Sequence, residues 1–385
     1  MKMNKRIGLV LFACLCLTAF SACGGSAPTA QPPANPAETP PETAQPATET
    51  EAWKQELERV YEEAKKEGEV AVIAGTGSDR EQLFKEFEEA YPGVKVNHIA
   101  LNNNAASARI VSEQQQGKYL IDVSIETTRG EYNKLKDYII DPGITDDQNW
   151  RNGFEYGFKT QEGTIYADRY IYAIEPYPII YINNDFIPAG EIQTMDDLLD
   201  PKWQGKAVAK DFSVNGQGTN ILVALSLTNS MEFVDQLLAN LNPTISSDDR
   251  QNIQWFASGR YPIAIGLNKT QINEFEDNGV IKNIQRLRFD QTRFYGSFSL
   301  AVLKDAPHPN ATKLFVNWLL SKEGQEAFAR NFDCCNSRRT DVPEPTSPDS
   351  FRWEQIDYAN GTANISQKGL DTTAEIIEKG KQFKK

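Results

Sequence analysis

Apolar runs alternate with amphipathic segments in the part of the chain that begins near residue 53. Residues 69–74 (EVAVIA) predict a buried strand, and the runs at 94–99 and 119–125 predict two more. Apolar residues recur at helical spacing over 53–64, 83–91 and about 105–116. Strands that alternate with helices form parallel sheets through right-handed crossovers. The pattern therefore predicts an α/β unit.

A second α/β unit is predicted between residues 205 and 284. Strands are expected at 205–210, around 244, at 261–266 and at 280–284, and helices near 220–227 and at 231–241, 248–258 and 271–275. Ligands of such sheets bind beyond the carboxyl ends of the strands. That rule selects the loops at 76–79 and 126–129 of the first unit.

Residues 296–325 combine an apolar strand, a turn and two helices. Pro307 and Pro309 end the strand predicted at 297–303. The next segment places apolar side chains on one helical face, namely Leu314, Phe315, Trp318 and Leu319. Asn310 and Ser321 are expected to cap the two helices, and Ser78 with Glu81 has the spacing of a capping box.

The N-terminus has the form of a secretion signal followed by a tether. Lys2, Lys5 and Arg6 precede an apolar run at 7–20, which is shorter than the about 20 residues of a membrane span. Residues 20–23 (FSAC) resemble a bacterial lipobox, which implies cleavage of 1–22 and lipidation of Cys23; the alternative is an ordinary secreted protein cut after Ala22. Residues 23–52, rich in Pro, Ala, Thr and Glu, predict a disordered tether. We expect a lipid anchor in the cell membrane, on its extracytoplasmic or periplasmic side.

Composition narrows the function classes. The net charge of −13 over 385 residues argues against nucleic acid and against electrostatic binding to anionic membranes. The sequence contains no GxSxG, HExxH or Walker motif and only two histidines, so we expect a binding protein rather than an enzyme, without a cofactor. Cys334 and Cys335 either form a vicinal disulfide or remain thiols.

Four segments resemble the extracellular solute-binding proteins of bacterial ABC importers, the family that includes the ferric-iron binders. They are 63–72 (EAKKEGEVAV) with 84–96, 196–208 (DDLLDPKWQGKAV), 258–265 (SGRYPIAI) and 306–325 (APHPNATKLFVNWLLSKEGQ). The resemblance spans about 53–343. It implies an α/β fold of the periplasmic-binding-protein type II, a two-lobed clamshell in which each lobe is a mostly parallel sheet flanked by helices.

The resemblance also implies the domain boundaries and the mode of action. Residues 53–176 with 297–332 would form lobe 1, and 177–296 with 333–385 would form lobe 2 and the C-terminal helices. The chain would cross between lobes at 177–183 and return through 294–302. A monomer would capture a small polar or anionic solute in the interlobe cleft and deliver it to a membrane permease. The alternatives are a ligand-presenting sensor for a receptor and a lipid-anchored hydrolase.

Candidate ligand-binding residues lie in loops at the expected cleft. Thr76, Ser78, Thr127, Thr128 and Arg129 follow strands of lobe 1. Asn215 and Gln217 lie where a helix begins, a position suited to anions. The remaining candidates are Asn268 and Lys269 after the strand at 261–266, and Tyr181, Tyr295 and Ser297 at the two crossings.

The choice of cargo depends on residues 266–270 (GLNKT). Ferric binders of the family carry a tyrosine pair in this loop, because Fe³⁺ prefers anionic oxygen ligands. Here Asn268 and Lys269 supply donors and a positive charge instead, which favours a carboxylate, phosphonate or sulfonate. The alternative is Fe³⁺ or an iron chelate as cargo, held by Tyr181 with Tyr295. Arg338 and Arg339 are interpreted as structural, and His308 as a turn residue.

Overall fold

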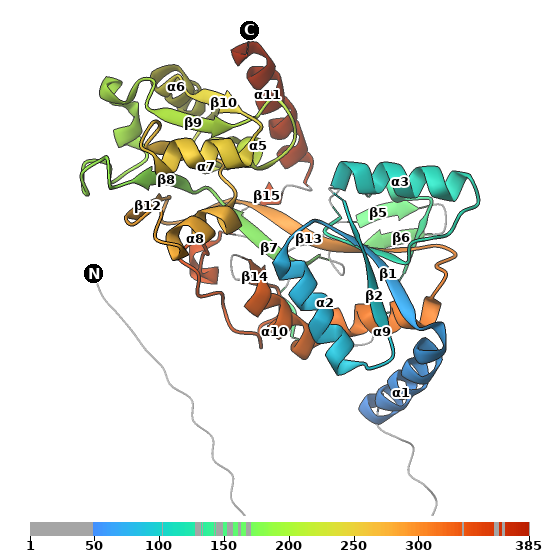
Figure 1. Ribbon diagram of the computed structural model, residues 1–385. Coiled ribbons are helices and arrows are strands. Elements are labelled where there is room, and N and C mark those ends of the chain that lie inside the picture. Colours follow the sequence, from blue (N-terminus) through green and yellow to red (C-terminus); the bar gives the residue numbers. More distant parts are fainter. Residues whose placement is uncertain are drawn as a thin grey trace, which may run out of the picture. The chain divides into compact units, whose positions relative to one another are not determined.

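Figure 1 shows the computed structural model of the chain. The described residues are 49–101, 103–127, 132, 134–141, 143, 149–151, 157–160, 163–166, 171–332, 335–357, 362–363 and 366–384. Cys23, Thr128, Arg129 and Cys334 lie outside them, so lipidation, two of the candidate ligand contacts and the disulfide stay predictions.

The larger sheet has the strand order β14-β7-β13-β3-β1-β2, with β4 and β15 paired to β13. β1 is parallel to β2 and β3, whereas β13 runs antiparallel to β3 and β7. The strands are β1 (Glu69–Ala74), β2 (Lys95–Ala100), β3 (Val123–Ile125), β4 (Ile139–Ile140), β7 (Ile171–Tyr177), β13 (Phe294–Leu303), β14 (Asn336–Ser337) and β15 (Thr362–Ala363). The associated helices are α1 (Glu49–Glu67), α2 (Ser78–Ala90), α3 (Asn103–Gln115), α9 (Pro309–Leu320) and α10 (Lys322–Asn331).

The smaller sheet has the order β10-β9-β11-β8-β12. β9 is parallel to β10 and β11, and β8 is antiparallel to β11 and β12. Its strands are β8 (Ile180–Asn183), β9 (Ala207–Lys210), β10 (Thr244–Ser246), β11 (Ile263–Ile265) and β12 (Ile284–Leu287). Its helices are α5 (Gln217–Thr228), α6 (Met231–Leu241), α7 (Asp249–Ala257), α8 (Lys269–Asp277) and α11 (Gln367–Phe383). Short 3-10 helices occur at Asp196–Leu199, Pro201–Trp203 and Trp353–Gln355, and β5 (Gly157–Thr160) pairs with β6 (Gly163–Tyr166) as a separate ladder.

Each sheet buries its own apolar core. Phe87, Phe315 and Trp318 pack in edge-on or tilted contacts against the larger sheet. Leu222, Val234 and Leu237 from α5 and α6 pack on the smaller sheet. Two sheets flanked by helices confirm the predicted two-lobed α/β class, with one refinement: both sheets mix parallel and antiparallel pairs.

The chain passes between the two sheets after β7 and again between β12 and β13. The first passage, at Tyr177–Ile180, falls in the predicted segment 177–183. The return through β13 (Phe294–Leu303) begins at the first residue of the predicted return 294–302, but residues 294–296, assigned to lobe 2, pair with β7 in the larger sheet. The tail also differs from the predicted division: β14 pairs with β7 in the larger sheet, whereas α11 packs on α5.

Several local predictions need correction. His308, not Asn310, stands at the N-cap position of α9, and its side chain makes no capping hydrogen bond. Instead, the carboxylate of Glu67 accepts from the backbone N–H groups of Asn310 (3.2 Å) and Ala311 (2.7 Å). Gly77 precedes α2, so Ser78 is its first helical residue and no capping box forms. The predicted strand at 280–284 is wrong, because β12 begins at Ile284, and the predicted strand at 119–125 shrinks to Val123–Ile125. Ser321 does cap α10, accepting from the N–H of Gly324 at 3.1 Å.

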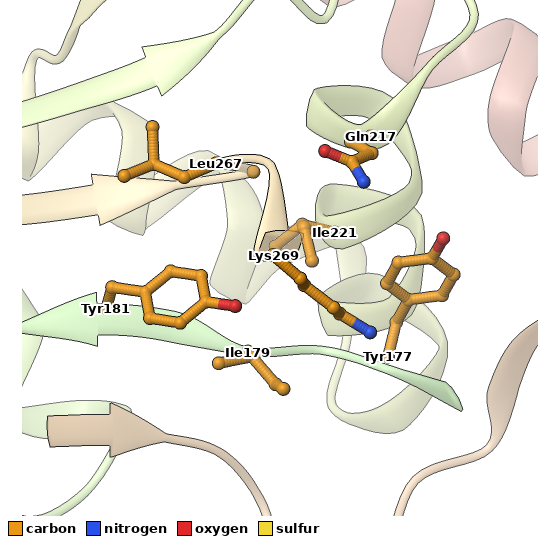
Figure 2. Close-up of a pocket in the computed structure, with 8 residues that line it drawn as sticks. Tyr177, Ile179, Tyr181, Gln217, Ile221, Leu267 and Lys269 are labelled. Carbon is orange, nitrogen blue, oxygen red and sulfur yellow. The ribbon is translucent and has the colours of Figure 1, made fainter. Parts of the chain in front are cut away.

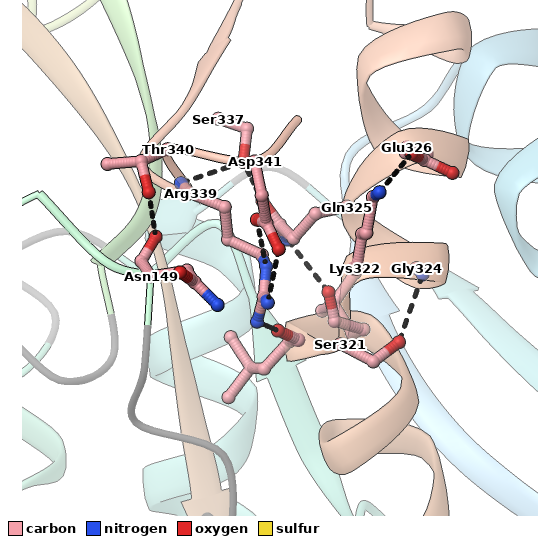
Figure 3. Close-up of polar contacts among 12 residues, drawn as sticks. Asn149, Ser321, Lys322, Gly324, Gln325, Glu326, Ser337, Arg339, Thr340 and Asp341 are labelled. Carbon is pink, nitrogen blue, oxygen red and sulfur yellow. Dashed lines mark hydrogen bonds and ion pairs between the residues drawn. The ribbon is translucent and has the colours of Figure 1, made fainter. Parts of the chain in front are cut away.

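A buried arginine ties β14 to the junction of α9 and α10 (Figure 3). The Arg339 guanidinium donates to both carboxylate oxygens of Asp341 (2.9 and 3.0 Å) and to the carbonyl of Leu320 at the end of α9 (3.1 Å). Ser337 continues the network by donating to Gln325 at 2.6 Å. A cation at a helix C-terminus also offsets the helix dipole. This geometry supports a structural role for Arg339.

Replacing Arg339 by alanine is expected to lower the free energy of unfolding by about 2–3 kcal/mol. The side chain is only 3% exposed, and its loss leaves the Leu320 carbonyl and Asp341 without their charged donor. The matched control is Arg330→Ala, which breaks an exposed pair with Glu86 and should cost less than about 1 kcal/mol. Urea unfolding followed by circular dichroism measures both, and equal losses would contradict the structural role.

Candidate functional site

A small pocket lies where the passage from β7 to β8 meets the first turns of α5 and α8. Figure 2 shows Lys269 extending between Tyr181 and Tyr177, with Ile179 beneath it. The other lining residues are Gln217, Ile221, Gly266 and Leu267. The free volume is about 10 Å³ for the centre of a water-sized sphere, which is room for about one water molecule. Any larger solute must therefore displace side chains.

Two glycines bring the lining residues together. Gly266 ends β11 with a φ of 75°, a conformation that favours glycine. Gly218 lies in the first turn of α5, and a Cβ on Gly266 would come within 2.8 Å of the Gly218 Cα atom. This close approach places the loop 266–268 against the start of α5. As a result Gln217, the first residue of α5, and Lys269, the first residue of α8, reach the same pocket.

Lys269 forms an ion pair with Glu175 of β7. Its ammonium lies 2.9 Å from Oε1 of Glu175 and 5.3 Å from the centre of the Tyr177 ring, and the Tyr177 hydroxyl donates to Oε2 at 2.6 Å. Burial by itself raises the pKa of the Glu175 carboxyl, but the Lys269 ammonium and the Tyr177 hydrogen bond outweigh burial and hold that pKa below its ordinary value. Lys269, which lines the pocket, is thus paired with the largely buried carboxylate of Glu175.

Tyr181 brings an unsatisfied hydroxyl to the same pocket. The side chain is 1% exposed, and its hydroxyl makes no hydrogen bond of ordinary geometry among the described residues, although the Asp349 carboxylate is near enough to act on it. Burial, and after it the Asp349 carboxylate, raise the pKa of Tyr181 well above the ordinary tyrosine value, so the phenol keeps its proton at neutral pH. A buried polar group without a partner costs about 1–3 kcal/mol. A bound solute can supply the missing partner.

A charged cluster beside the larger sheet acts electrostatically on Glu175. Arg80 of α2 donates to Glu126 (2.7 Å) and Asp79 (2.6 Å). Burial lowers the pKa of Arg80, but the two carboxylates outweigh it and raise that pKa. The charge of Arg80 also contributes to lowering the pKa of Glu175. Glu126 has a φ of 99°, a strained value for a residue with a side chain and one that clusters at ligand sites.

The structure brings together three of the residues predicted from sequence, and the other described candidates do not line this pocket. Tyr181, Gln217 and Lys269 line one pocket. Asn268 caps α8 by accepting from the N–H of Gln271 at 3.1 Å. Thr127 is buried and bonds to Ser124, whereas Thr76, Ser78 and Asn215 are exposed outside this pocket.

Tyr295 and Ser297 point away from Glu175. In the β7–β13 ladder Glu175 faces Gly296, Tyr295 faces Pro176, and Ser297 faces Ile174. Residues that face each other across antiparallel strands share a side of the sheet, and neighbours along a strand alternate sides. Tyr295 and Ser297 therefore lie on the side opposite Glu175. Tyr295 packs with Phe351 and Trp353, and burial raises its pKa to about 12.

The list of candidate residues omitted Tyr177, Glu175, Arg80 and Glu126. A signal existed for each: Glu126 begins the selected loop 126–129, Arg80 follows the selected loop 76–79, Tyr177 begins the predicted crossing 177–183, and Glu175 is the one charged residue within the apolar strand IYAIEPY. Among the described residues, no cluster of three or more His, Cys, Asp or Glu is arranged to hold a metal ion. None of the described helices has the length and apolar content that a membrane span requires.

Solved structures share this fold over most of the chain. Iron-bound HitA from Pseudomonas aeruginosa is 16% identical with a TM-score of 0.60, and covers 82% of this chain and 99% of its own. The substrate-binding protein of an ABC transporter from Agrobacterium tumefaciens is 15% identical with a TM-score of 0.60 (83% and 96% covered). AfuA of Actinobacillus pleuropneumoniae, with fructose-6-phosphate bound, is 20% identical with a TM-score of 0.53 (80% and 96% covered). The fold is that of the periplasmic binding proteins.

The family follows from the sequence match. The model of the bacterial extracellular solute-binding proteins matches residues 82–338, which is more than half of the chain. The chain belongs to this family of solute-binding proteins. The family is extracellular, so this protein works outside the cytoplasm.

Proposed function

We propose that this protein captures a small organic solute with an anionic group in the pocket of Lys269 and delivers it to the permease of an ABC importer. The observation that carries this proposal is that the buried Tyr181 hydroxyl, which makes no hydrogen bond of ordinary geometry, and the Lys269 ammonium line the same pocket. A phenol that keeps its proton donates a hydrogen bond, and an ammonium attracts negative charge. Together they suit a carboxylate, phosphonate or sulfonate oxygen.

Helix geometry supports the same charge preference. Gln217 begins α5 and Lys269 begins α8, so the positive ends of two helix dipoles meet at this pocket. Among the described residues no side chain caps the first turn of α5. Backbone N–H groups at helix N-termini commonly bind anions. AfuA, which shares this fold, holds the organic anion fructose-6-phosphate.

The proposed route is capture near the membrane followed by transfer. Lipidation at Cys23 and the tether at 23–52 would keep the protein near its permease and raise its effective concentration there. Closure of the two lobes on the solute would add contacts from Arg80 and Glu126, and these differential contacts would stabilise the closed form. The structural relative from Agrobacterium tumefaciens is the substrate-binding protein of an ABC transporter.

Ferric iron is the second candidate cargo, and it rests on Tyr181 in the pocket and on the iron-bound relative HitA. Fe³⁺ needs phenolate or carboxylate oxygens. Burial raises the pKa of Tyr181 well above the ordinary tyrosine value and that of Tyr295 to about 12, so both phenols hold their protons more tightly than an ordinary tyrosine. The Lys269 ammonium and the two helix N-termini at the pocket favour the organic anion.

A ligand screen on the full-length protein tests the choice. Thermal shifts are measured with dicarboxylates, phosphonates, sulfonates, sugar phosphates and ferric citrate, and hits are titrated by calorimetry. A ligand present at 100 times its Kd should add about 2.7 kcal/mol of stability. We expect an organic anion to give this shift. A shift with ferric ion alone, together with a visible phenolate charge-transfer band, would contradict the proposal.

A further inference from the structure

The ion pair of Glu175 and Lys269 joins the two sheets of the molecule. Glu175 lies in β7 of the larger sheet, and Lys269 begins α8 beside the smaller sheet. Their side chains are only 16% and 8% exposed, and the ion pair is 2.9 Å long. A pair this buried is screened little by salt. The ion pair therefore holds the ammonium of Lys269 in place. The pocket beside it has room for only about one water molecule.

The second oxygen of Glu175 is held independently of Lys269. The hydroxyl of Tyr177 donates to it at 2.6 Å. Across the ladder Glu175 faces Gly296, which has no side chain, so space beside the carboxylate is not filled from β13. Arg80 of α2 is a further positive charge near enough to lower the pKa of Glu175. Tyr177 and Arg80 therefore still stabilise the Glu175 carboxylate when Lys269 binds a solute instead.

We infer that Glu175 is a built-in counter-ion that occupies the position of the solute's anionic group, and that an incoming anion displaces it from Lys269. The inference rests on the proposed function, since it concerns the same pocket. It makes Glu175 a specificity-determining residue. A neutral solute cannot replace the lost ion pair, whereas an anion restores a charged partner for Lys269 and also satisfies Tyr181.

Displacing Glu175 from Lys269 is expected to change the protonation of the Glu175 carboxyl. Lys269 is the largest of the influences that lower the pKa of Glu175, against the opposing effect of burial. Once a solute takes Lys269, Glu175 remains buried with Tyr177 of β7 and with Arg80 of α2 nearby, and its pKa rises. The carboxyl then binds a proton more readily. Anion affinity is therefore expected to increase as the pH falls, with proton uptake on binding.

The test compares sulfate binding by the full-length protein and by Glu175→Gln. Sulfate is the probe because its charge does not change between pH 5.5 and 8. Glutamine keeps the size of the side chain and still accepts from Tyr177. We expect the variant to bind sulfate at least tenfold more tightly at pH 8 than the unmodified protein, and to lose the pH dependence. Calorimetry in two buffers of different ionisation enthalpy should show proton uptake only in the unmodified protein.

Two further variants separate the possible outcomes. Glu274→Gln removes a carboxylate from the exposed side of α8 and should leave the sulfate affinity within twofold. If Glu175→Gln binds sulfate no more tightly than the unmodified protein, while Lys269→Met abolishes binding, the counter-ion inference is overturned and the anion pocket stands. If Lys269→Met leaves sulfate binding unchanged, or if no form binds sulfate, the proposed pocket itself is overturned.

Discussion

Replacing Lys269 by methionine is expected to weaken sulfate binding at least 100-fold, which corresponds to about 2.7 kcal/mol. Methionine fills a similar volume but removes the charge. An anion entering the altered pocket would meet Glu175 with no ammonium to balance it. Truncating one partner of a buried charge pair costs about 2–5 kcal/mol in binding. Isothermal titration calorimetry measures the loss directly.

The matched control is Lys282→Met, which removes an exposed positive charge from the same lobe. This variant should bind sulfate within threefold of the unmodified protein, since exposed charges are screened by salt. If both variants lost sulfate affinity to a comparable extent, the loss would reflect the overall charge of the protein and not the pocket of Lys269.

Lys269→Met should also change the dependence of stability on pH. In the unmodified protein the pKa of Glu175 is lowered, so its contribution to stability is present above its unfolded pKa and is lost as the pH falls through the folded value. Without Lys269, burial dominates and raises that pKa. The variant should then be destabilised at neutral pH and recover as the pH falls through the raised pKa. Melting curves from pH 5 to pH 8 would show the reversed slope.

Replacing Gly218 by alanine should destabilise the protein by more than about 3 kcal/mol. A Cβ on Gly218 would lie 2.3 Å from the carbonyl oxygen of Lys210 and 3.0 Å from that of Asp211. Both neighbours are backbone atoms, so the start of α5 must move away from β9. Helix propensity alone predicts the opposite sign, because alanine in a helix is favoured over glycine by about 1 kcal/mol. The contact therefore decides the outcome.

The control for this variant lies two residues earlier. Gly216 precedes α5, has a φ of 161°, which is extended backbone, and has open space where a Cβ would be added. Gly216→Ala should change the unfolding free energy by less than about 0.5 kcal/mol. Denaturant unfolding measures both variants. A Gly218→Ala protein as stable as the unmodified one would show that α5 and β9 are not packed as described.

Local patterns predicted most helices and strands, and the errors have a common cause. The apolar runs EVAVIA and SFSLAVL became β1 and most of β13, and α6 has the predicted bounds. At 280–284 the apolar residues Val280 and Ile281 suggested a strand, but pairing with β8 begins only at Ile284. At the start of α9, Asn310 looked like the cap. Glu67, from a distant helix end, supplies the acceptor instead.

The prediction of the candidate site likewise succeeded where local patterns were enough and failed where contacts between distant segments decided. Sequence alone drew attention to Tyr181, Gln217 and Lys269, because each stands in a loop or crossing of a recognisable α/β pattern. It placed Tyr295 beside them, and only the register of β13 on β7 shows that this side chain points away from Glu175. Glu175 stands out in the sequence as a charged residue in an apolar strand. Its partner Lys269 is distant in sequence and could not be identified from the residues next to Glu175.

The amino-acid sequence by itself determined the alternation of strands and helices, the family and the position of Lys269 at a helix start, because these depend on short-range periodicity and local motifs. The tertiary structure decided which charges meet. The contact of Gly218 with Gly266 brings two helix N-termini to one pocket, and the passage from β7 to β8 places Glu175 2.9 Å from Lys269. Coulomb energy depends on that distance and on burial, and neither quantity is written in the order of residues along the chain.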